Sequence, residues 1–584
     1  MKLPVAFLVL CATLAAQLMP ISVGPNPTVW PPAIDGSGQS VLVSSSIAPS
    51  GEISSASDLY LLRSDGTVLS KLTNLSNNGA TWVDLSPDGK TAAYNVTVST
   101  PPGMEEIHVV DTSTAANRKI ATDTVGCVQP LASAICFGCF FSCIRTVHFS
   151  PDASKVVYSA SENQPLYVVN ADGSGILHLP VSQAALAPSP QRVISANGLL
   201  VFSGQDVNTI HLDGTGLQTL THLPPNSYPY NAIISADGGT IVYQSGTPAQ
   251  LFVVHLDGSA PRQLTSDQLD SSAPSLSANG SLVAYLQVGQ VFLRRTDGAT
   301  PPARLTNFLY LNATAVTLSA DGSKALVTVR SISGNSAAAY LAVPGGTPAP
   351  LFAPMTVLPN GVTSFSGMMA PTPGSLIKIQ GLNFVNDTFV SAAGTPLPLT
   401  LGGLSASVNG VPMPVQSVSP SVIVAQLPFE AAAGSSNFTV KASGGGELTA
   451  TATVQATMPE VLNYTLPFLG TSYAMAFHAG TSIPADQAHP ASAGEVLESY
   501  GVGLGAANPA VADGTPAPSN PPATVLAAPQ VKIGNQIAKV TFAGPAPGLV
   551  GIYQVNVVVP SGLKPGAQPF SWAVNNNWTI YVQN

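Results

Sequence analysis

The sequence predicts an all-β protein, a β-propeller followed by two small β-sandwiches, and three observations support this. A turn of the form Ser-Pro/Ala-Asp/Asn-Gly, as in Ser86–Gly89, recurs along the first part of the chain, each time before a short apolar run. Glycine and proline, 52 residues each, fall at turns between strand-like runs. Beyond residue 355 these turns give way to alternating apolar strands separated by Gly- and Pro-rich loops.

Length and composition predict two to four domains with well-packed cores, because the chain has 584 residues and 45% of them are apolar. Charged residues make up only 8% of the chain, against roughly 25% in an average soluble domain. A protein surface with so few charges is more familiar outside the cell than in the cytosol. The net charge of −9 is spread without any run of Lys or Arg. We therefore expect neither nucleic acid nor an anionic membrane surface as a partner.

The N-terminus, residues 1–24, predicts a secretory signal peptide, with Lys2 before an apolar segment from Leu3 to Ala16. This segment is shorter than the about 20 residues of a transmembrane helix, although an uncleaved anchor remains an alternative. Cys11 is interpreted as part of the cleaved segment, since no small residue precedes it as in a lipoprotein. The prediction is a protein exported to the periplasm, cell surface or medium, with no transmembrane segment after cleavage.

Residues 25–355 repeat with the spacing of propeller blades. The Asp or Asn of each marker turn recurs at intervals of 40 to 64 residues, and a second series of Asp-Gly turns interleaves with the first. Each unit thus contains four strands, which is typical of a blade in a β-propeller. The seven markers are Asp35, Asp88, Asp152, Asn197, Asp237, Asn279 and Asp321. They predict seven blades, or six if the first and last units merge into one.

The marker turn, its apolar strand and a later Leu-Thr pair, as at Leu72-Thr73, Leu264-Thr265 and Leu305-Thr306, resemble the WD40-like repeat of TolB-type β-propellers. This resemblance covers a little over half of the chain. It implies the fold and leaves the function open, because such propellers serve as protein-binding platforms, peptidase partners and lyases.

A cysteine-rich insertion at 127–143 interrupts the repeat. It holds Cys127, Cys136, Cys139 and Cys143. In an exported chain, disulfides are the favoured interpretation, with three possible pairings. A zinc or iron-sulfur site is the alternative that the Cys136–Cys139 spacing invites, but a second CxxC is missing. Free thiols are the third possibility.

Residues 356–460 and 461–584 predict two tandem β-sandwiches, because the strand and turn pattern of the first is echoed in the second. Both resemble the immunoglobulin-like (Ig-like) IPT/TIG fold. The string from Phe542 to Pro560 resembles more closely the uncharacterised C-terminal domain of many secreted acidobacterial proteins. That resemblance implies an extracellular accessory module without known chemistry.

No motif supports a catalytic assignment, a cofactor or a metal. The nearest string to a GxSxG elbow, around Ser472, lacks the last glycine. His478, Asp486 and His489 are close in sequence, but they are interpreted as solvated groups of a Pro/Ala-rich loop rather than as a metal or acid-base site. The Asp-Gly turns each supply one carboxylate, so hairpin geometry explains them better than calcium binding does.

The predicted binding site is the mouth of the propeller channel, where loops entering the inner strands converge. Counting four and five positions back from each marker serine gives an aromatic and polar rim: Trp82, Arg145, Gln191, Tyr230 and Asn231. The alternative is that several of these side chains only pack between blades.

These observations predict a secreted, non-enzymatic, monomeric protein whose propeller binds a protein or glycan at the cell envelope, with the sandwiches as spacer or attachment modules. One alternative is a polysaccharide lyase or glycosidase, which should gather a His, an Arg and carboxylates at one end of the channel. The predicted rim has only one charged residue, Arg145. A purely structural envelope component is the other alternative.

Overall fold

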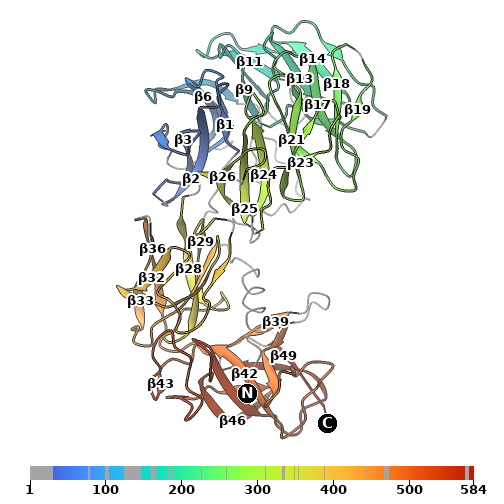
Figure 1. Cartoon of the computed structure of the whole chain (residues 1–584). Coiled ribbons are helices and arrows are strands. Elements are labelled where there is room, and N and C mark those ends of the chain that lie inside the picture. Colours follow the sequence, from blue (N-terminus) through green and yellow to red (C-terminus); the bar gives the residue numbers. More distant parts are fainter. Residues whose placement is uncertain are drawn as a thin grey trace. The chain divides into compact units, whose positions relative to one another are not determined.

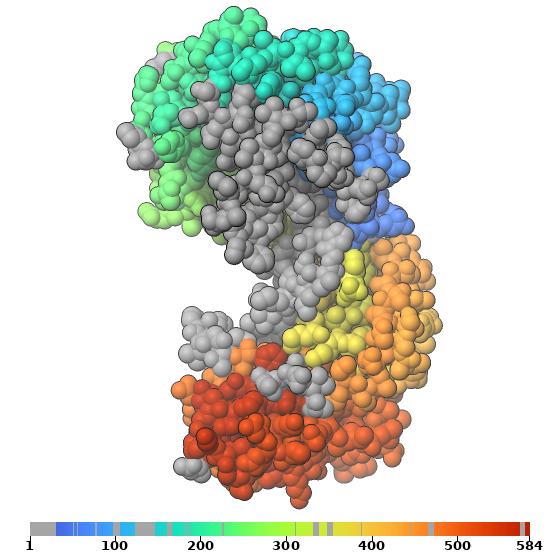
Figure 2. All heavy atoms as spheres, turned by 180° about the vertical axis from the view of Figure 1, so that it is seen from behind, coloured from blue at the N-terminus to red at the C-terminus, as the bar shows by residue number. Residues whose placement is uncertain are grey.

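The structure is a computed structural model that describes residues 31–583, except 51, 76–78, 99–103, 124–145, 160–165, 182–183, 189, 225–226, 258, 310, 332–335, 347–348, 353, 387, 444, 466–471 and 573–577. The predicted signal peptide, the four clustered cysteines and Arg145 lie outside the described residues. In the described ranges every regular element is a strand, and no helix is long and apolar enough to cross a membrane. The chain forms two compact units, Pro25–Pro354 and Met355–Asn584. Figure 2 shows the residues of each unit grouped together by colour.

The N-terminal unit is propeller-like: its described residues form seven antiparallel sheets, and each sheet takes only consecutive strands (Figure 1). The first three sheets hold β1 (Ala33–Ile34), β2 (Ser40–Ile47), β3 (Ile53–Arg63) and β4 (Val68–Lys71); β5 (Ala80–Leu85), β6 (Thr91–Val98), β7 (Met104–Asp111) and β8 (Asn117–Asp123); and β9 (Thr146–Phe149), β10 (Lys155–Ser159), β11 (Leu166–Asn170) and β12 (Leu177–His178).

The fourth sheet has three strands, and the last three sheets have four each. They hold β13 (Leu199–Ser203), β14 (Val207–His211) and β15 (Gln218–Thr219); β16 (Tyr230–Ile234), β17 (Thr240–Ser245), β18 (Gln250–His255) and β19 (Arg262–Gln263); β20 (Ser272–Leu276), β21 (Leu282–Gln287), β22 (Gln290–Arg295) and β23 (Ala303–Arg304); and β24 (Leu311–Leu318), β25 (Ala325–Ser331), β26 (Ser336–Ala342) and β27 (Ala349–Phe352).

Side-chain packing closes the ring between the first and seventh sheets. Val41 and Leu62 of the first sheet share a buried cluster with Leu326 and Ala339 of the seventh. Lys324 also donates a hydrogen bond from Nζ to the Gly38 carbonyl at 3.4 Å. Because each sheet uses consecutive strands, the first and last sheets meet without exchanging a strand.

The marker turns are held by a repeated local network. In six of them the Ser Oγ donates to the Asp or Asn Oδ1 at 2.5 to 2.9 Å. In the turn at Ser86, the same hydroxyl accepts a hydrogen bond from the Thr91 N–H at 2.9 Å. Gly89 has φ 71°, a conformation that favours glycine. This chemistry is local, which is why the turns could be recognised from sequence.

Backbone hydrogen bonds at the second residue of the marker turn connect several neighbouring sheets. The N–H groups of Ala196, Ala236 and Ala278 donate to the carbonyls of Ala236, Ala278 and Ala320 at 2.6 to 2.7 Å, and Gly36 donates to Pro87 at 2.8 Å. Pro87 and Pro151 have no N–H, so this belt of backbone hydrogen bonds cannot continue from the second sheet to the third or from the third to the fourth.

The Leu-Thr pairs fasten the outer part of a sheet. Leu72 is 4% exposed and packs in the core beside the second sheet. Thr73 Oγ1 accepts a hydrogen bond from the Leu59 N–H and donates to the Asp58 carboxylate, both at 2.9 Å. The Thr hydroxyl accepts the corresponding strand N–H in three other sheets, at Thr221, Thr265 and Thr306.

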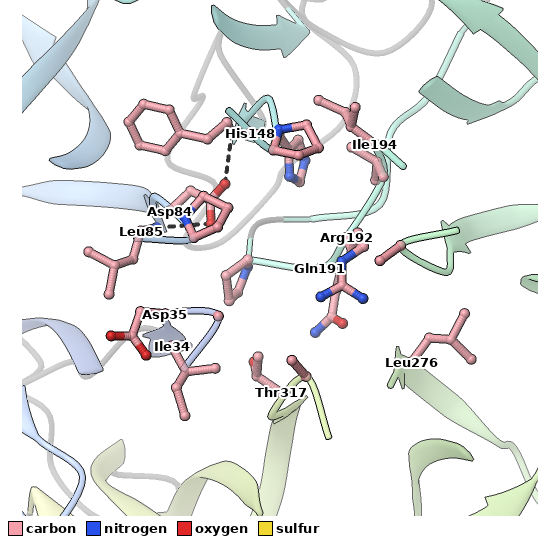
Figure 3. Close-up of a pocket in the computed structure, with 18 of the residues that line it drawn as sticks. Ile34, Asp35, Asp84, Leu85, His148, Gln191, Arg192, Ile194, Leu276 and Thr317 are labelled. Atoms are coloured by element: carbon pink, nitrogen blue, oxygen red, sulfur yellow. Dashed lines mark hydrogen bonds between the residues drawn. The ribbon is translucent and has the colours of Figure 1, made fainter. Parts of the chain in front are cut away.

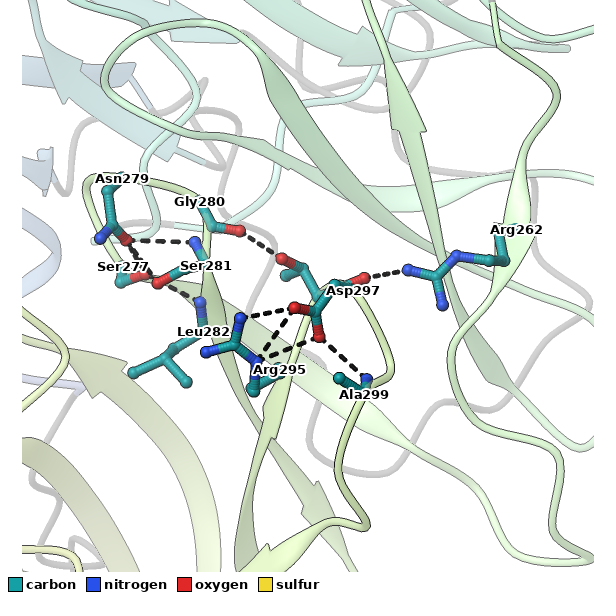
Figure 4. Close-up of polar contacts among 10 residues, drawn as sticks. Arg262, Ser277, Asn279, Gly280, Ser281, Leu282, Arg295, Asp297 and Ala299 are labelled. Atoms are coloured by element: carbon teal, nitrogen blue, oxygen red, sulfur yellow. Dashed lines mark hydrogen bonds and ion pairs between the residues drawn. The ribbon is translucent and has the colours of Figure 1, made fainter.

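Polar side chains near the outer strands also join neighbouring sheets (Figure 4). Arg262 of the fifth sheet donates from Nη2 to the Thr296 carbonyl of the sixth. Thr296 Oγ1 donates to the Gly280 carbonyl at 2.5 Å, which ties the outer turn of that sheet to its marker turn. Asp297 accepts from Arg295 and from the Ala299 N–H, so its carboxylate is used within the turn.

The first part of the C-terminal unit contains two facing antiparallel sheets. Ile377 and Ile379 from one sheet and Phe438 and Val440 from the other are buried in a common core. One sheet has the order β28 (Thr356–Ser364), β29 (Leu376–Leu382), β35 (Val422–Gln426), β34 (Val415–Val418) and β30 (Val390–Ser391). The other has β31 (Thr400–Leu401), β32 (Leu404–Val408), β36 (Gly434–Ala442) and β37 (Glu447–Val454), and β33 (Val411–Met413) pairs with β32.

The last part of the chain forms one barrel-like sheet. Its order is β38 (Glu460–Val461), β42 (Val496–Val502), β47 (Tyr553–Val558), β46 (Gln536–Pro545), β45 (Val531–Ile533), β48 (Gly566–Trp572), β49 (Trp578–Val582), β40 (Ser472–Ala474) and β39 (Asn463–Thr465), with β41 (Ala476–His478) beside β42. β43 (Ala507–Asn508) and β44 (Thr524–Val525) form a separate pair. Trp578 Nε1 donates to the Val461 carbonyl at 3.1 Å, joining β49 to β38. A second two-sheet sandwich is thus not shown.

The two parts of the C-terminal unit are joined by buried hydrogen bonds. The Gly503 N–H donates to Ser375 Oγ at 2.9 Å, and the Gly514 N–H donates to Gln426 Oε1 at 2.6 Å. Tyr553, which is 0% exposed, donates from Oη to the Pro373 carbonyl of the first part at 3.4 Å. Both predicted sandwich regions therefore belong to one compact unit.

Candidate functional site

A cavity of about 200 Å³ lies at the centre of the propeller-like unit (Figure 3). Strands of five sheets line it, together with the segment before the fourth sheet and the turn after β16 of the fifth. It lies where the inner strands end and the marker turns begin. One lining residue from or beside each sheet, in chain order, is Ile34, Asp84, His148, Gln191, Ala236, Leu276 and Thr317, of which Gln191 precedes β13 and Ala236 follows β16. The cavity therefore belongs to the channel at the centre of the ring.

Asp84, at the end of β5, faces this cavity and also links two sheets. Its Oδ2 accepts a hydrogen bond from the Phe149 N–H of the third sheet at 2.8 Å, and its Oδ1 accepts from the Leu85 N–H at 2.9 Å. Burial raises the pKa of Asp84 from 3.8 to about 7, although these hydrogen bonds and the charge of Arg192 act in the opposite direction. The carboxyl group is thus close to half-ionised at neutral pH.

Arg192 supplies a positive charge to the same cavity. Its Nη1 is shielded from solvent and has no hydrogen-bond partner among the described residues. Burial lowers the pKa of Arg192, and the carboxylate of Asp84 partly offsets this. The Arg192 guanidinium and the Asp84 carboxylate attract each other over a longer distance than in an ion pair, because they form no ion pair within 4 Å. Figure 3 shows the Arg192 guanidinium in the central space between the sheets.

Gln191 crosses the channel. Its Nε2 donates to the Val316 carbonyl of the seventh sheet at 2.8 Å, which fixes the orientation of the amide. Gln191 Oε1 and Thr317 Oγ1 are both buried, and neither has a hydrogen-bond partner within the described ranges. Together with Arg192 Nη1, three polar atoms of residues that line one cavity lack hydrogen-bond partners among the described residues.

His148, on β9, has a structural role. It is 2% exposed, and its Nε2 lies 3.0 Å from the Ala187 carbonyl of the segment that leads into the fourth sheet. Burial lowers the pKa of His148 to about 4, so the ring is neutral at physiological pH. Asp84 and His148 thus join the second to the third sheet and the third to the fourth, the two places where Pro87 and Pro151 interrupt the backbone belt.

Of the four predicted rim residues that the structure describes, only Gln191 lines the cavity, and Arg145 lies outside the described residues. Trp82 is partly buried and packs against the core between the second and third sheets. Tyr230 is 38% exposed at the start of β16, and Asn231 Nδ2 donates to Gln244 Oε1 at 2.7 Å. The titratable residues that line the cavity, Asp35, Asp84, His148 and Arg192, were not among the predicted rim residues. Polar residues inside apolar inner strands, at 84 and 148, are the signal that could have revealed two of them.

The loop histidines of the C-terminal unit interact with carboxylates. His478 Nδ1 is hydrogen-bonded to Glu495 Oε1, and His489 Nδ1 lies 3.3 Å from Asp486 Oδ1. In the part of the chain that the structure describes, no group of three or more His, Cys, Asp or Glu side chains is arranged to hold a metal.

We expect the contribution of His478 to the stability of the C-terminal unit to fall as the pH rises from 6 to 8. Burial alone would lower the pKa of His478, but hydrogen bonds to Glu495 and to the His489 carbonyl raise it overall. A raised folded-state pKa stabilises the fold below the ordinary value near 6.5, and this contribution is lost as the pH rises through the folded-state value. Thermal unfolding at both pH values measures it. The pH dependence should shrink in Glu495→Gln, and an unchanged dependence would contradict this prediction.

No protein-family model matches the sequence, and no curated protein is significantly similar to it. Solved structures that resemble the chain include an oligogalacturonate lyase from Vibrio parahaemolyticus, with 13% identity, a TM-score of 0.40, and coverage of 54% of this chain and 89% of that one. An oligogalacturonate lyase in complex with manganese has 16% identity, a TM-score of 0.39, and coverage of 55% and 91%. The β-propeller domain of the trilobed protease from Pyrococcus furiosus has 12% identity, a TM-score of 0.38, and coverage of 56% and 98%.

Proposed function

We propose that this chain is a secreted, non-enzymatic binding protein. The propeller-like unit is the platform that binds a protein or glycan at the cell envelope, through its central channel. The C-terminal unit, with Ig-like IPT/TIG modules, acts as a spacer or surface attachment. The signal-like N-terminus and the low content of charged residues, 8%, support export.

The observation that carries this proposal is the set of unpartnered polar atoms in the channel. Buried polar groups nearly always have hydrogen-bond partners, and leaving one without a partner costs about 1–3 kcal/mol. Arg192 Nη1, Gln191 Oε1 and Thr317 Oγ1 line the same cavity and have none in the described structure. A few convergent polar groups in a concave apolar setting are typical of ligand sites.

A second surface lies at the other end of an inner strand. Tyr228 and Tyr230, which precede and begin β16, are 56% and 38% exposed. Exposed tyrosines are frequent anchors in binding interfaces, so this pair is the alternative contact surface.

The full chain, applied to a glycan array and to envelope extract in a pull-down, should retain a partner. Ala320→Phe adds a ring to the channel lining and should abolish that binding, whereas Ala299→Phe, in an exposed turn, should not. Binding that survives Ala320→Phe but disappears in Tyr228→Ala/Tyr230→Ala would move the site to the tyrosine surface. No specific partner in either assay would refute the proposed function.

One observation favours an enzyme as the second candidate. The channel gathers a histidine, an arginine and a carboxyl group with a pKa of about 7, and a group with such a pKa can act as a general base at neutral pH. Against this, the Nε2 of His148 is engaged by a backbone carbonyl, and Asp35 accepts hydrogen bonds from Gln39 and Ser40 within its turn. Breakdown of a polysaccharide on the same array that Asp84→Ser abolishes would establish catalysis in place of binding alone.

A further inference from the structure

The hydrogen bond by which Asp84 links two sheets does not require an ionisable side chain. Asp84 Oδ2 accepts the Phe149 N–H of the next sheet at 2.8 Å. In the sixth sheet, Ser275 occupies the equivalent position, two residues before the marker serine, and its Oγ accepts the Leu318 N–H of the next sheet at 2.9 Å. A neutral hydroxyl therefore makes the same connection, and the ionisable group at Asp84 is available for another purpose.

Arg192 Nη1 likewise has no hydrogen-bond partner among the described residues that would explain its place in the cavity. A buried cation without hydrogen bonds or a close counter-ion lowers stability, and apolar side chains of similar volume are often tolerated better in such places. Stability is commonly sacrificed at binding sites, where a group awaits its ligand. Arg192 Nη1 lines the cavity that Asp84 also faces, so an anion between them would satisfy the donor.

We propose that the channel binds a small free carboxylic acid that carries a hydroxyl beside its carboxylate, and that Asp84 is protonated in the complex. The carboxylate accepts from Arg192 and from the Thr317 hydroxyl, and the hydroxyl of the ligand donates to Gln191 Oε1. The volume of about 200 Å³ holds roughly seven waters at about 30 Å³ each, which is enough for a small acid. This inference rests on the proposed function only in taking the channel as a binding site.

The charged groups that face Asp84 fix the direction of the pH dependence. His148, on β9, is neutral above about pH 5, because burial lowers its pKa to about 4. Asp35 also lines the cavity, but its carboxylate accepts from Ser37, Gln39 and Ser40 within its own turn. Arg192 remains charged. The net change near neutral pH is thus the charge on Asp84, which repels an anion when it is ionised.

The test is calorimetric titration of the full chain with L-lactate. A site that takes the anion only when Asp84 is protonated binds about tenfold more weakly at pH 8 than at pH 6, given its pKa of about 7. At pH 7, binding should take up about half a proton, measured by repeating the titration in two buffers of different ionisation enthalpy. L-lactamide, the neutral analogue, should not bind, and acetate should bind more weakly than lactate because it lacks the hydroxyl.

Two variants separate the roles of the charged groups. Arg192→Met should abolish lactate binding at both pH values while leaving the melting temperature unchanged or higher. Asp84→Ser places at residue 84 the hydroxyl that Ser275 has at the equivalent position. This variant should bind lactate at pH 8 as tightly as the unaltered chain does at pH 6. Asp65→Ser makes the same chemical change in an exposed turn and should alter nothing.

Three results would overturn the inference: no lactate binding to the unaltered chain, equal affinity at pH 6 and pH 8, or binding that survives Arg192→Met. The array and pull-down distinguish these failures from a failure of the proposed function. If Arg192→Met still retained a macromolecular partner, the proposed function would be supported and the acid site would not. If the chain bound lactate but retained no macromolecular partner, the acid site would be supported and the proposed function would not.

Discussion

Replacing Glu460 by leucine is expected to lower the free energy of unfolding of the C-terminal unit by about 3–5 kcal/mol. Lys378 on β29 and Glu460 on β38 are 5% and 2% exposed. Burial lowers the pKa of Lys378 to about 8, and the charge of Glu460 counteracts this shift. Burial likewise raises the pKa of Glu460, whose carboxylate accepts a hydrogen bond from Ser364 at 2.8 Å. Without Glu460, the buried ammonium of Lys378 loses this counter-charge.

The double variant Lys378→Met/Glu460→Leu is the matched control. It removes both charges together, and well-packed apolar residues often replace a buried ion pair at little cost. Most of the lost stability should therefore return. Urea denaturation followed by tryptophan fluorescence measures the effect, since Trp572 and Trp578 lie in this unit. If the single variant Glu460→Leu were as stable as the unaltered chain, the carboxylate of Glu460 would not stabilise the buried ammonium of Lys378.

Replacing Trp572 by alanine should cost about 3–5 kcal/mol in the same unit, as is typical of a buried aromatic side chain. Trp572, on β48, is 1% exposed, and its Nε1 donates to Ser499 Oγ of β42 at 3.1 Å. It also fills the space over Gly501, where an added Cβ would come within 2.4 Å of the indole ring. The alanine variant leaves a large cavity and removes a link between two strands of the barrel-like sheet.

Ile537→Ala provides the comparison, because Ile537 lies on β46 of the same sheet but is 63% exposed. Its effect should stay within about 0.5 kcal/mol. Equal losses for the two variants in the same denaturation experiment would show that Trp572 does not hold the core together.

The sheets of the N-terminal unit could be predicted because their signals are local. Ser86, Asp88 and Gly89 form one turn within four residues, and the same network recurs at the other markers. The propeller-like arrangement then follows from repeating a unit that cannot bury both faces alone.

The channel residues were harder to predict because the inner strands contain bulges. The pairing of β5 with β6 shifts between Ala80 and Val83, and that of β16 with β17 shifts between Tyr230 and Ile233. Asn231, inside the second bulge, has φ 52°. Since a bulge breaks the alternation of side chains between faces, positions four and five before the marker serine could not be assigned to the channel by counting.

The barrel-like sheet could not be foreseen from the echoed motifs of the two C-terminal regions. Such motifs predict strands, but not which strands pair over long separations. β45 pairs with β48, and Trp578 reaches back to Val461, 117 residues earlier. Nor do local patterns reveal that Tyr553 donates a hydrogen bond to the Pro373 carbonyl of the preceding region.

The closure of the ring without a shared strand bears on how the gene for such a protein could be rearranged. Every sheet is encoded by an uninterrupted stretch of chain, so the two ends of the ring, near Ala33 and Phe352, belong to neighbouring sheets that share no strand. A circular permutant that joins these ends and begins at another loop between sheets would keep every strand pairing intact. A whole blade could be duplicated or lost in one genetic step for the same reason, and the number of blades is thereby free to change in evolution.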